Sequence, residues 1–424
     1  MIQNVGHLLR SRRFLPLFST QFLGAFNDSL FKQAVVLFVT YQLLRDPAKE
    51  FQFSAIAQGL FILPFFLLSA LSGQLADDHD KSRLIRIIKF AEIGIMIVGG
   101  AGIMLTSKFL MLAAVFAMGV HSTFFGPIKY AILPQHLSKD EVLGGTGLVE
   151  AGTYLAILGG TILAGVLAST PDIAAATTVG IAVLGFLTGR QVPPAPPAAE
   201  RIPFNWHIIR GSVQLVSGTM HIRRLFLAIL AISFFWTIGA VLIIIFPPLV
   251  KNVLGANEQV ASLFIGIFSI GIAIGSVLIN RLLKSEVSAR FAPASVVAMG
   301  VFVLLLHFVS LAWGKRGPDL TTLGNFIFHP MAGLMIVALL GVSICGGMFV
   351  VPLYAFLTTT VPKTETARTV AANNIVNSGA MVIGSLMAFA LSSVGVGPVG
   401  QLLLVAGMCL VAAWLGWKLH LACD

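Results

Sequence analysis

Apolar stretches of membrane-spanning length recur along the whole chain. About 20 consecutive apolar residues are needed for a helix to cross the hydrocarbon core. Only 10% of the residues are charged and 57% are hydrophobic, which excludes an ordinary soluble globular protein. The predicted spans cover roughly residues 14–42, 53–75, 84–106, 109–131, 142–169, 173–190, 224–250, 259–283, 290–313, 330–357, 367–392 and 397–419. We therefore expect twelve transmembrane segments.

These segments predict helices rather than barrel strands. Each one is continuously apolar with Gly and Ala dispersed through it, whereas barrel strands alternate polar and apolar residues over about ten positions. The basic residues between spans gather on the side that carries both termini, as Arg83, Arg86, Arg223 and Arg224 illustrate. By the positive-inside rule, both termini are expected in the cytoplasm. The sequence thus predicts an all-α, multi-pass membrane protein.

A Pro-rich break divides the spans into six and six. We expect an N-terminal six-helix bundle over 1–190, a cytoplasmic linker with an amphipathic helix over 191–223, and a C-terminal six-helix bundle over 224–424. The halves also share residues at an offset of 224 positions: Phe125, Tyr130, Ala131 and Gly160 match Phe349, Tyr354, Ala355 and Gly384. A parallel repeat of this kind is typical of transporters that hold their substrate between two bundles.

The first span contains charge well inside its apolar stretch. Asp28 and Lys32 are four residues apart, so they share one helical face, and Asn27 adds amide donors and acceptors beside them. Ionisable groups at membrane depth are costly, which makes them candidates for a substrate or ion site. The alternative is a structural ion pair. We predict that all three residues bind substrate.

A second group of polar residues lies in spans three to five. Lys129 follows Gly126 and Pro127, which are expected to loosen the helix, and Tyr130 comes next. Glu150 enters span five from the same side and is predicted to face Lys129. We assign Lys129, Tyr130 and Glu150 to the substrate site, although Lys129 reaching toward headgroups is the alternative. For the remaining polar residues of these spans, the sequence favours a local pair of Lys89 with Glu92 and a packed, polar His121.

The second half is polar but almost uncharged. Tyr354 and Asn374 are candidate substrate ligands, while Asn373 and Asn377, which share a helical face, favour hydrogen bonds between helices as much as ligand binding. Aromatic residues are frequent in this half: Phe234, Phe235, Trp236, Phe246, Phe264, Phe268 and Phe349. A cavity with one charged wall and one apolar wall suits an amphiphile. Paired charges suit a zwitterion, with Lys32 or Lys129 for a phosphate and Asp28 or Glu150 for an ammonium.

The turn between the second and third spans carries a further motif. The string "GQLADDHDKSR" includes Gly73, Asp77, Lys81 and Arg83. It resembles the loop motif of the major facilitator superfamily, in which a Gly permits close helix packing and an Asp latches the inner gate. Asp78 and Asp80 stand where that motif usually has Arg and Gly, so an altered latch is expected.

Two strings carry a more specific resemblance. "AFNDSLFKQAVVLF" and "FFGPIKYAILPQHL" resemble the bacterial lysophospholipid transporter family, a branch of the major facilitator superfamily, and the likeness follows the span order across the chain. The resemblance implies a flippase that returns lysophospholipids, chiefly lysophosphatidylethanolamine, from the outer to the inner leaflet. It also implies a functional partner, an acyltransferase with an acyl carrier protein synthetase, and places Asp28, Lys129 and Glu150 at the polar site.

Two other functions compete with this interpretation. A proton-coupled exporter of lipophilic drugs would share the fold and would use Asp28 or Glu150 as the proton carrier. An integral acyltransferase would need a histidine and an acid, for which the chain offers only His136 with Glu141 in a short loop. We expect a transporter, no catalytic residues, no cofactor, no metal and no nucleic-acid partner.

Overall fold

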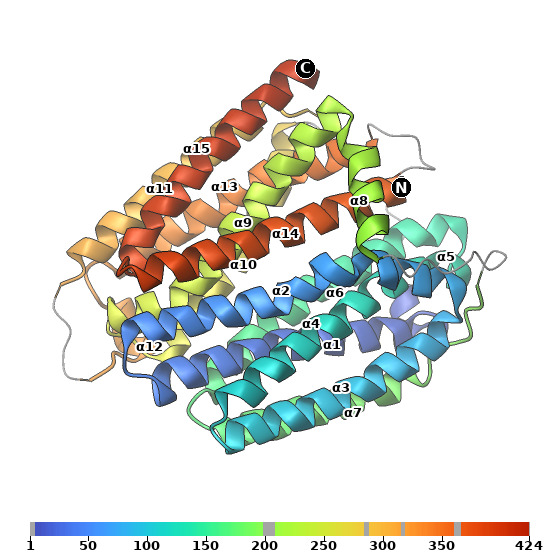
Figure 1. Cartoon of the computed structure of the whole chain (residues 1–424), viewed down its shortest axis with the longest axis horizontal. Helices are drawn as coiled ribbons and strands as arrows, with labels where there is room; N and C mark the ends of the chain where they lie inside the picture. Colours follow the sequence, from blue (N-terminus) through green and yellow to red (C-terminus); the bar gives the residue numbers. More distant parts are fainter. Residues whose placement is uncertain (1–4, 198–207, 284–287, 315–318, 360–365, 424) are drawn as a thin grey trace. The chain divides into compact units, whose positions relative to one another are not determined.

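Long helices make up nearly all of the structure. The computed structural model describes residues 5–197, 208–283, 288–314, 319–359 and 366–423, and a few side chains inside helices, among them those of Asp77 and Glu150, lie outside this description. The long helices are α1 (Leu15–Phe38), α2 (Pro47–Asp78), α3 (Lys81–Met104), α4 (Lys108–Ala131), α6 (Lys139–Leu167), α7 (Pro171–Gly189), α9 (Arg223–Asn252), α10 (Glu258–Leu282), α11 (Ala292–Ala312), α13 (Ala332–Thr359), α14 (Thr366–Ser393) and α15 (Pro398–Cys423). Figure 1 shows them in chain order from blue to red.

Within the described residues, eleven helices are long and apolar enough to cross a membrane. The predicted fifth span coincides with α6. Its described apolar stretch, Ala151–Leu167, is shorter than the other candidate spans and is not counted among the eleven. The prediction of an all-α membrane protein is confirmed, and the exact number of twelve spans remains a prediction. Short elements complete the chain: the 3₁₀ helix η1 (Val5–Arg10), the π-helix η2 (Val39–Leu43), α5 (Leu133–His136), α8 (Ile208–Met220) and α12 (Leu323–Ile327).

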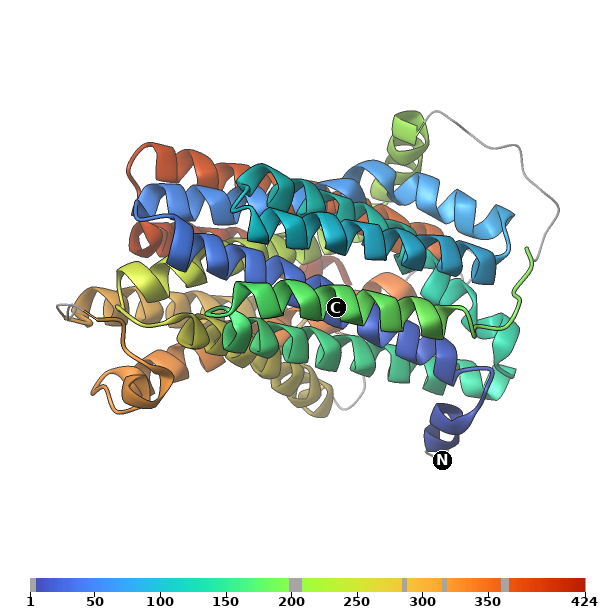
Figure 2. The ribbon, with the colours of Figure 1, turned by 90° about the horizontal axis from the view of Figure 1, so that it is seen from below.

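The chain forms two compact units. Unit 1 comprises residues 1–38 and 67–211, and unit 2 comprises residues 39–66 and 212–424. The first part of α2 therefore belongs to unit 2 and its last part to unit 1. The predicted linker contains α8, while residues 198–207 lie outside the described residues. Within each unit the long helices run side by side (Figure 2).

In unit 1, glycines bring α6 against the first helix. α1 packs on α6 and α7, and α3 packs on α4 and α7 (Figure 1). An added Cβ at Gly152 of α6 would lie 2.7 Å from the Phe18 ring, and one at Gly160 would lie 2.3 Å from the Phe26 carbonyl oxygen. Because only a residue without a side chain fits such contacts, these positions let α1 and α6 approach closely.

Unit 2 repeats this packing with its own helices. α14 packs on α9, α15 packs on α9 and α11, and α10 packs on α13. Gly384 of α14 lies against α9, where an added Cβ would be 2.4 Å from Thr237 Cγ2. Gly160 and Gly384, matched in sequence by the 224-residue offset, thus occupy the same kind of contact with the first long helix of their halves. The internal repeat inferred from the sequence is present in the packing.

Gly275 is the position in α10 where a side chain is least tolerable. An added Cβ would lie 2.0 Å from the Ile344 carbonyl oxygen of α13, and backbone cannot move aside as a flexible side chain can. We expect Gly275→Ala to destabilise unit 2 by about 1 to 3 kcal/mol, the usual cost of overpacking. Thermal unfolding of purified protein in detergent measures this.

Gly407→Ala is the matched control for that substitution. Gly407 lies within α15, where an added Cβ has no described atom within 4 Å, so alanine is expected to leave stability unchanged or raised through its higher helix propensity. Equal unfolding temperatures for the two variants would show that α10 and α13 separate without cost.

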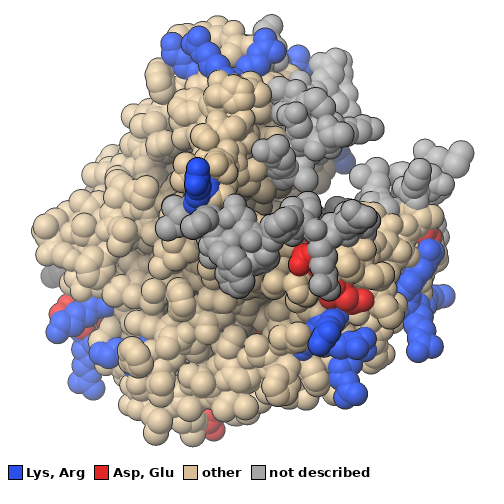
Figure 3. Space-filling model, turned by 45° about the vertical axis from the view of Figure 1, so that its right-hand side comes forward, with Lys and Arg blue, Asp and Glu red and all other residues tan. Residues whose placement is uncertain are grey.

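The surface agrees with a membrane location for each unit. On the face drawn in Figure 3, most of the described surface carries neither basic nor acidic side chains, and Lys and Arg gather in small separate groups. Large apolar side chains are exposed on helices of both units, such as Phe90 and Leu155 in unit 1 and Phe308 and Leu410 in unit 2. Such apolar exposure suits helices that face lipid.

Candidate functional site

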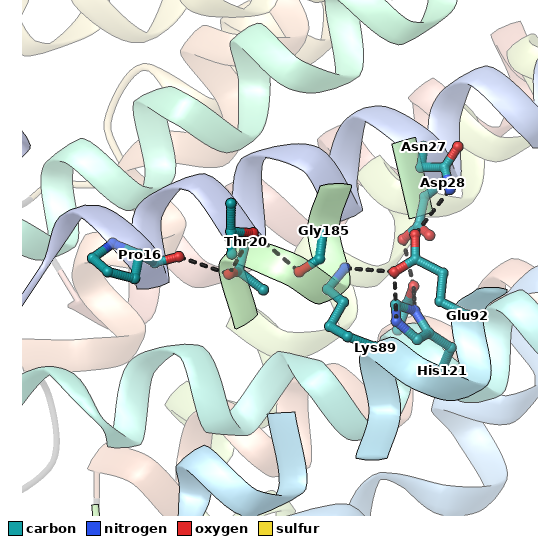
Figure 4. A network of polar contacts seen from close by, with 10 residues as sticks. Pro16, Thr20, Asn27, Asp28, Lys89, Glu92, His121 and Gly185 are labelled. Carbon is teal, nitrogen blue, oxygen red and sulfur yellow. Dashed lines mark hydrogen bonds and ion pairs between the residues drawn. The ribbon is translucent and has the colours of Figure 1, made fainter. Parts of the chain in front are cut away.

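A buried polar network lies at the centre of unit 1, and Glu92 is its hub (Figure 4). Its carboxylate accepts hydrogen bonds from the Lys89 ammonium at 2.6 Å and from the Asn27 amide at 2.9 Å. The His121 ring nitrogen Nε2 lies 3.3 Å from the same carboxylate. Lys89, Glu92 and Asn27 are at most 1% exposed. Three helices, α1, α3 and α4, thereby meet through one carboxylate.

Small residues on neighbouring helices make room for Lys89. An added Cβ at Gly24 of α1 would lie 2.5 Å from the Lys89 Nζ, and one at Gly185 of α7 would lie 3.7 Å from the same atom. The ammonium also lies 5.1 Å from the centroid of the Phe125 ring, a cation–π distance. The lysine is therefore enclosed by α1, α4 and α7 rather than extended toward headgroups.

Asp28 adjoins this network and is less completely paired. Its Oδ2 accepts a short hydrogen bond from the Ser122 hydroxyl of α4, and its carboxylate interacts electrostatically with His121 and with Lys32 one turn further along α1. Among the residues that the structure describes, the other oxygen, Oδ1, is buried without a hydrogen-bond donor, as is Oδ1 of Asn27. Two neighbouring acceptors therefore lack a donor from this part of the chain, which in a buried site costs free energy unless a ligand supplies one.

The named charges of this region balance. Lys32 and Lys89 carry two positive charges, and Asp28 and Glu92 carry two negative ones, so the group is neutral when His121 is neutral. Buried charges are tolerated when they are paired in this way. A zwitterionic ligand would preserve the balance, whereas a singly charged one would disturb it.

Lys129 lies away from the hub, near the end of α4. Its Nζ is 4.8 Å from the centroid of the Tyr130 ring, and Tyr130 is exposed. The prediction that Gly126 and Pro127 loosen the helix is wrong at the level of secondary structure, because α4 continues through Pro127 to Ala131. Seven residues of helix separate Lys129 from Ser122, a rise of about 10 Å. Glu150, the predicted partner, has a side chain outside those described.

Unit 2 contains a separate, uncharged cluster. Trp236 Nε1 of α9 donates to the Tyr354 hydroxyl of α13 at 2.7 Å, and Asn377 Nδ2 of α14 lies 3.4 Å from the same oxygen. The Ser233 hydroxyl donates to Asn377 Oδ1 at 2.7 Å. Tyr354 therefore belongs to this uncharged cluster, whereas Asn374 is exposed, and the assignment of both residues to the substrate site stays a prediction.

Three of the aromatic residues predicted for the apolar wall lie in the core of unit 2. Phe246, Phe264 and Phe349 are completely buried, and the Phe246 and Phe264 rings meet edge to face at 5.7 Å between centroids. They form core packing within unit 2. This part of the predicted cavity is a packed core because α9, α10 and α13 close on these rings.

The turn between α2 and α3 is held by Asp80. Its carboxylate caps α3, accepting from the Arg83 backbone N–H at 3.0 Å and from the Ser82 hydroxyl at 2.7 Å. Lys81 is buried, and its backbone N–H donates to the Ala195 carbonyl, while Arg83 is exposed. The expected close packing at Gly73 is absent among the described atoms, since an added Cβ would meet none within 4 Å. The Asp77 side chain lies outside the described residues, so the gating role of this turn stays a prediction.

The His136 and Glu141 pair has a structural role. Glu141 closes a capping box at the start of α6, accepting from the Ser138 N–H at 2.9 Å and from its hydroxyl at 2.8 Å, and it pairs with Arg13 at 2.7 Å. Hydrogen bonds from the Ser138 backbone and hydroxyl, and from His7, lower the pKa of Glu141 to about 2. A carboxyl group that stays ionised and fully engaged is unsuited to act as a catalytic acid at neutral pH.

Comparison with known proteins agrees with the fold. Residues 17–318 match the family description Major Facilitator Superfamily, and this chain belongs to that superfamily of transporters. The chain is 27% identical over 378 residues to the "Lysophospholipid transporter LplT" of Citrobacter koseri, covering 88% of this chain and 87% of that protein. It is 26% identical over 379 residues to the protein of the same name from Salmonella heidelberg, with 88% and 86% covered.

Solved transporters share the architecture at low sequence identity. The nucleoside transporter NupG superposes with a TM-score of 0.70 at 14% identity, covering 96% of this chain and all of that one. A bacterial homologue of the lysosomal transporter Spinster, in an inward-facing and unoccupied conformation, gives 0.69 at 12% identity, with 97% of each chain covered. These similarities show the fold alone. The family match identifies the chain as a multi-pass membrane transporter, and the acyltransferase interpretation is set aside.

Proposed function

We propose that this protein transports lysophospholipids, chiefly lysophosphatidylethanolamine, from the outer to the inner leaflet of a bacterial inner membrane. The observation that carries the proposal is the pair of buried acceptors without donors, Asn27 Oδ1 and Asp28 Oδ1, beside a cationic Lys32 on the same helix. An ammonium group supplies the missing donors, and a phosphate suits the lysine. The names of the curated relatives support the same substrate class.

The spacing of the charges fits one zwitterionic headgroup. Residues four apart on a helix have Cβ atoms about 5 to 6 Å apart, so Asp28 and Lys32 present opposite charges within the span of an ethanolamine phosphate. Lys129, about two turns along α4 from Ser122, is proposed as the last phosphate contact, near the cytoplasmic face of the membrane. The headgroup then passes between these positions while the two units alternate access to the two leaflets, with both termini in the cytoplasm.

The product of this movement would be consumed at the inner leaflet. A lysophospholipid carries one free hydroxyl in place of an acyl ester, so an acyl transfer reaction is the step that uses it. A separate acyltransferase with an acyl carrier protein synthetase is the proposed functional partner.

Uptake of labelled lysophosphatidylethanolamine by cells or spheroplasts tests the proposal. Protein-dependent uptake above empty-vector cells is expected, and Asp28→Asn is expected to lower it about tenfold or more, since hydrogen bonds to charged groups are the stronger ones. Lys129→Ala should also lower it. Asp46→Asn and Lys108→Ala, at exposed positions, are the matched controls. Normal uptake by well-expressed Asp28→Asn and Lys129→Ala would contradict the site assignment.

A proton-coupled exporter of lipophilic compounds is the second candidate. The buried pair of His121 with Glu92 favours it, because a histidine beside a carboxylate is a ready proton carrier. The two functions respond differently to an uncoupler. Uptake that survives dissipation of the proton gradient supports a flippase driven by the lipid gradient, whereas no uptake of the lipid together with uncoupler-sensitive drug export supports the exporter.

A further inference from the structure

Asn373 of α14 is a buried amide with neither end satisfied. Its side chain is 0% exposed, and both Nδ2 and Oδ1 have no hydrogen-bond partner. An amide offers two N–H donors and an acceptor oxygen, and burying both kinds unpaired is unfavourable. In the described part of the chain, Asn373 is the residue whose side chain has its donor and its acceptor both buried and unpaired.

The position of Asn373 connects it to the uncharged cluster of unit 2. It lies one turn before Asn377 on the same face of α14, and Asn377 is bonded to Ser233 and lies beside Tyr354. One turn before Ser233 on α9 comes the buried, apolar Ile229. Among the described residues, no side chain of α9 bonds to the Asn373 amide.

The members of this cluster differ in exposure. Trp236 and Tyr354 are half-buried, whereas Asn377 is 5% exposed and Asn373 is completely buried. The side chains of Ser233, Trp236, Tyr354, Asn373 and Asn377 are all uncharged. A group that reached this cluster would therefore be neutral and would need both to donate and to accept a hydrogen bond at Asn373.

We infer that this cluster is a second, uncharged subsite, which takes the free hydroxyl of a monoacyl glycerol backbone. The inference rests on the proposed function and deepens it, because a lysophospholipid differs from a two-chain phospholipid by that hydroxyl. A hydroxyl donates to Oδ1 and accepts from Nδ2 of the same amide. Asn373 is thus a specificity residue that distinguishes one-chain lipids from lipids whose second position is esterified or empty.

The test compares two probes, lysophosphatidylethanolamine and its analogue without the glycerol hydroxyl. Wild-type protein is expected to take up the hydroxyl-bearing lipid about 3- to 10-fold better, the factor that a neutral hydrogen bond supplies. Asn373→Leu should transport both probes equally, while Asn325→Leu, the same change at an exposed position of α12, should keep the preference. Retained preference in Asn373→Leu would overturn the subsite.

Thermal unfolding without ligand provides an independent measurement. Because Asn373→Leu replaces an unpaired buried amide by an apolar side chain of similar size, the variant is expected to unfold at a higher temperature than wild type. A lower unfolding temperature would show that the amide is already paired in the resting protein, by water for example, and would also overturn the inference. Wild-type protein that transports neither probe would contradict the proposed function itself, whereas uptake without any preference contradicts the subsite alone.

Discussion

Lys251→Met is expected to destabilise unit 2 by about 3 to 5 kcal/mol, the cost of leaving a buried charge without its partner. The Lys251 ammonium lies 2.6 Å from Glu50 Oε1, and Glu50 is 1% exposed. The Lys251 ammonium also donates to the backbone carbonyls of Thr40 and Leu44 around η2. Asn252 donates to the other Glu50 oxygen. One lysine therefore holds the end of α9, the start of α2 and the π-helix together.

Thermal unfolding of the variant in detergent measures the effect. Lys49→Met is the matched control, because the Lys49 side chain is 68% exposed and its distance to Asp46 is 3.9 Å, so about 0.5 kcal/mol or less is expected. The double variant Glu50→Gln with Lys251→Met should recover much of the lost stability, since no buried charge then remains unpaired. A double variant as unstable as Lys251→Met would show that the carbonyl contacts, not the ion pair, carry the stabilisation.

Lys89→Met is expected to destabilise unit 1 by a similar free energy of unfolding. It leaves the Glu92 carboxylate, 1% exposed, with Asn27 and His121 as its remaining contacts. Glu92→Gln should destabilise comparably by leaving the completely buried Lys89 ammonium unpaired. The double variant removes both charges and should recover most of the stability.

Uptake by the double variant separates a structural role from a transport role. Since Asp28 and Lys32 are unchanged in it, we expect lysophosphatidylethanolamine uptake within about threefold of wild type, a difference of less than 1 kcal/mol. Full stability with uptake as low as that of Asp28→Asn would instead place the Lys89–Glu92 pair in the transport path. The same cells treated with an uncoupler show whether the pair serves proton coupling.

The helices and the repeat were predictable because their signals are local or periodic. Continuous apolar length predicted each span, and the 224-residue offset paired Gly160 with Gly384, which occupy equivalent helix contacts. The depth of Asp28 within the first span predicted a substrate-binding residue, and this role stays a prediction, while the structure shows its carboxylate bonded to Ser122 of α4. None of these predictions needed to know which helices are neighbours.

Predicting Glu92 as the hub of the network would have required knowing which helices are neighbours. Glu92 bonds to Asn27, 65 residues away, and Asp28 bonds to Ser122, 94 residues away. The sequence signal was present, since Lys89 and Glu92 are three apart inside an apolar span and His121 lies inside another, but nothing local placed α1, α3 and α4 together. Which of Asn373 and Asn374 is buried could not be predicted for the same reason, because the packing of neighbouring helices decides which face of α14 is buried.

The contact between Glu50 and Lys251 also sets an order of assembly. Lys251 follows Glu50 by 201 residues in the chain, and ribosomes add about 5 to 20 residues per second. Lys251 is therefore synthesised roughly 10 to 40 seconds after Glu50. A charge with no partner is costly inside the bilayer, so Glu50 and the α1–α2 connection must stay at the aqueous surface until α9 has been inserted. The α1–α2 hairpin of this transporter is therefore among the first segments to be synthesised and among the last to reach its final packing.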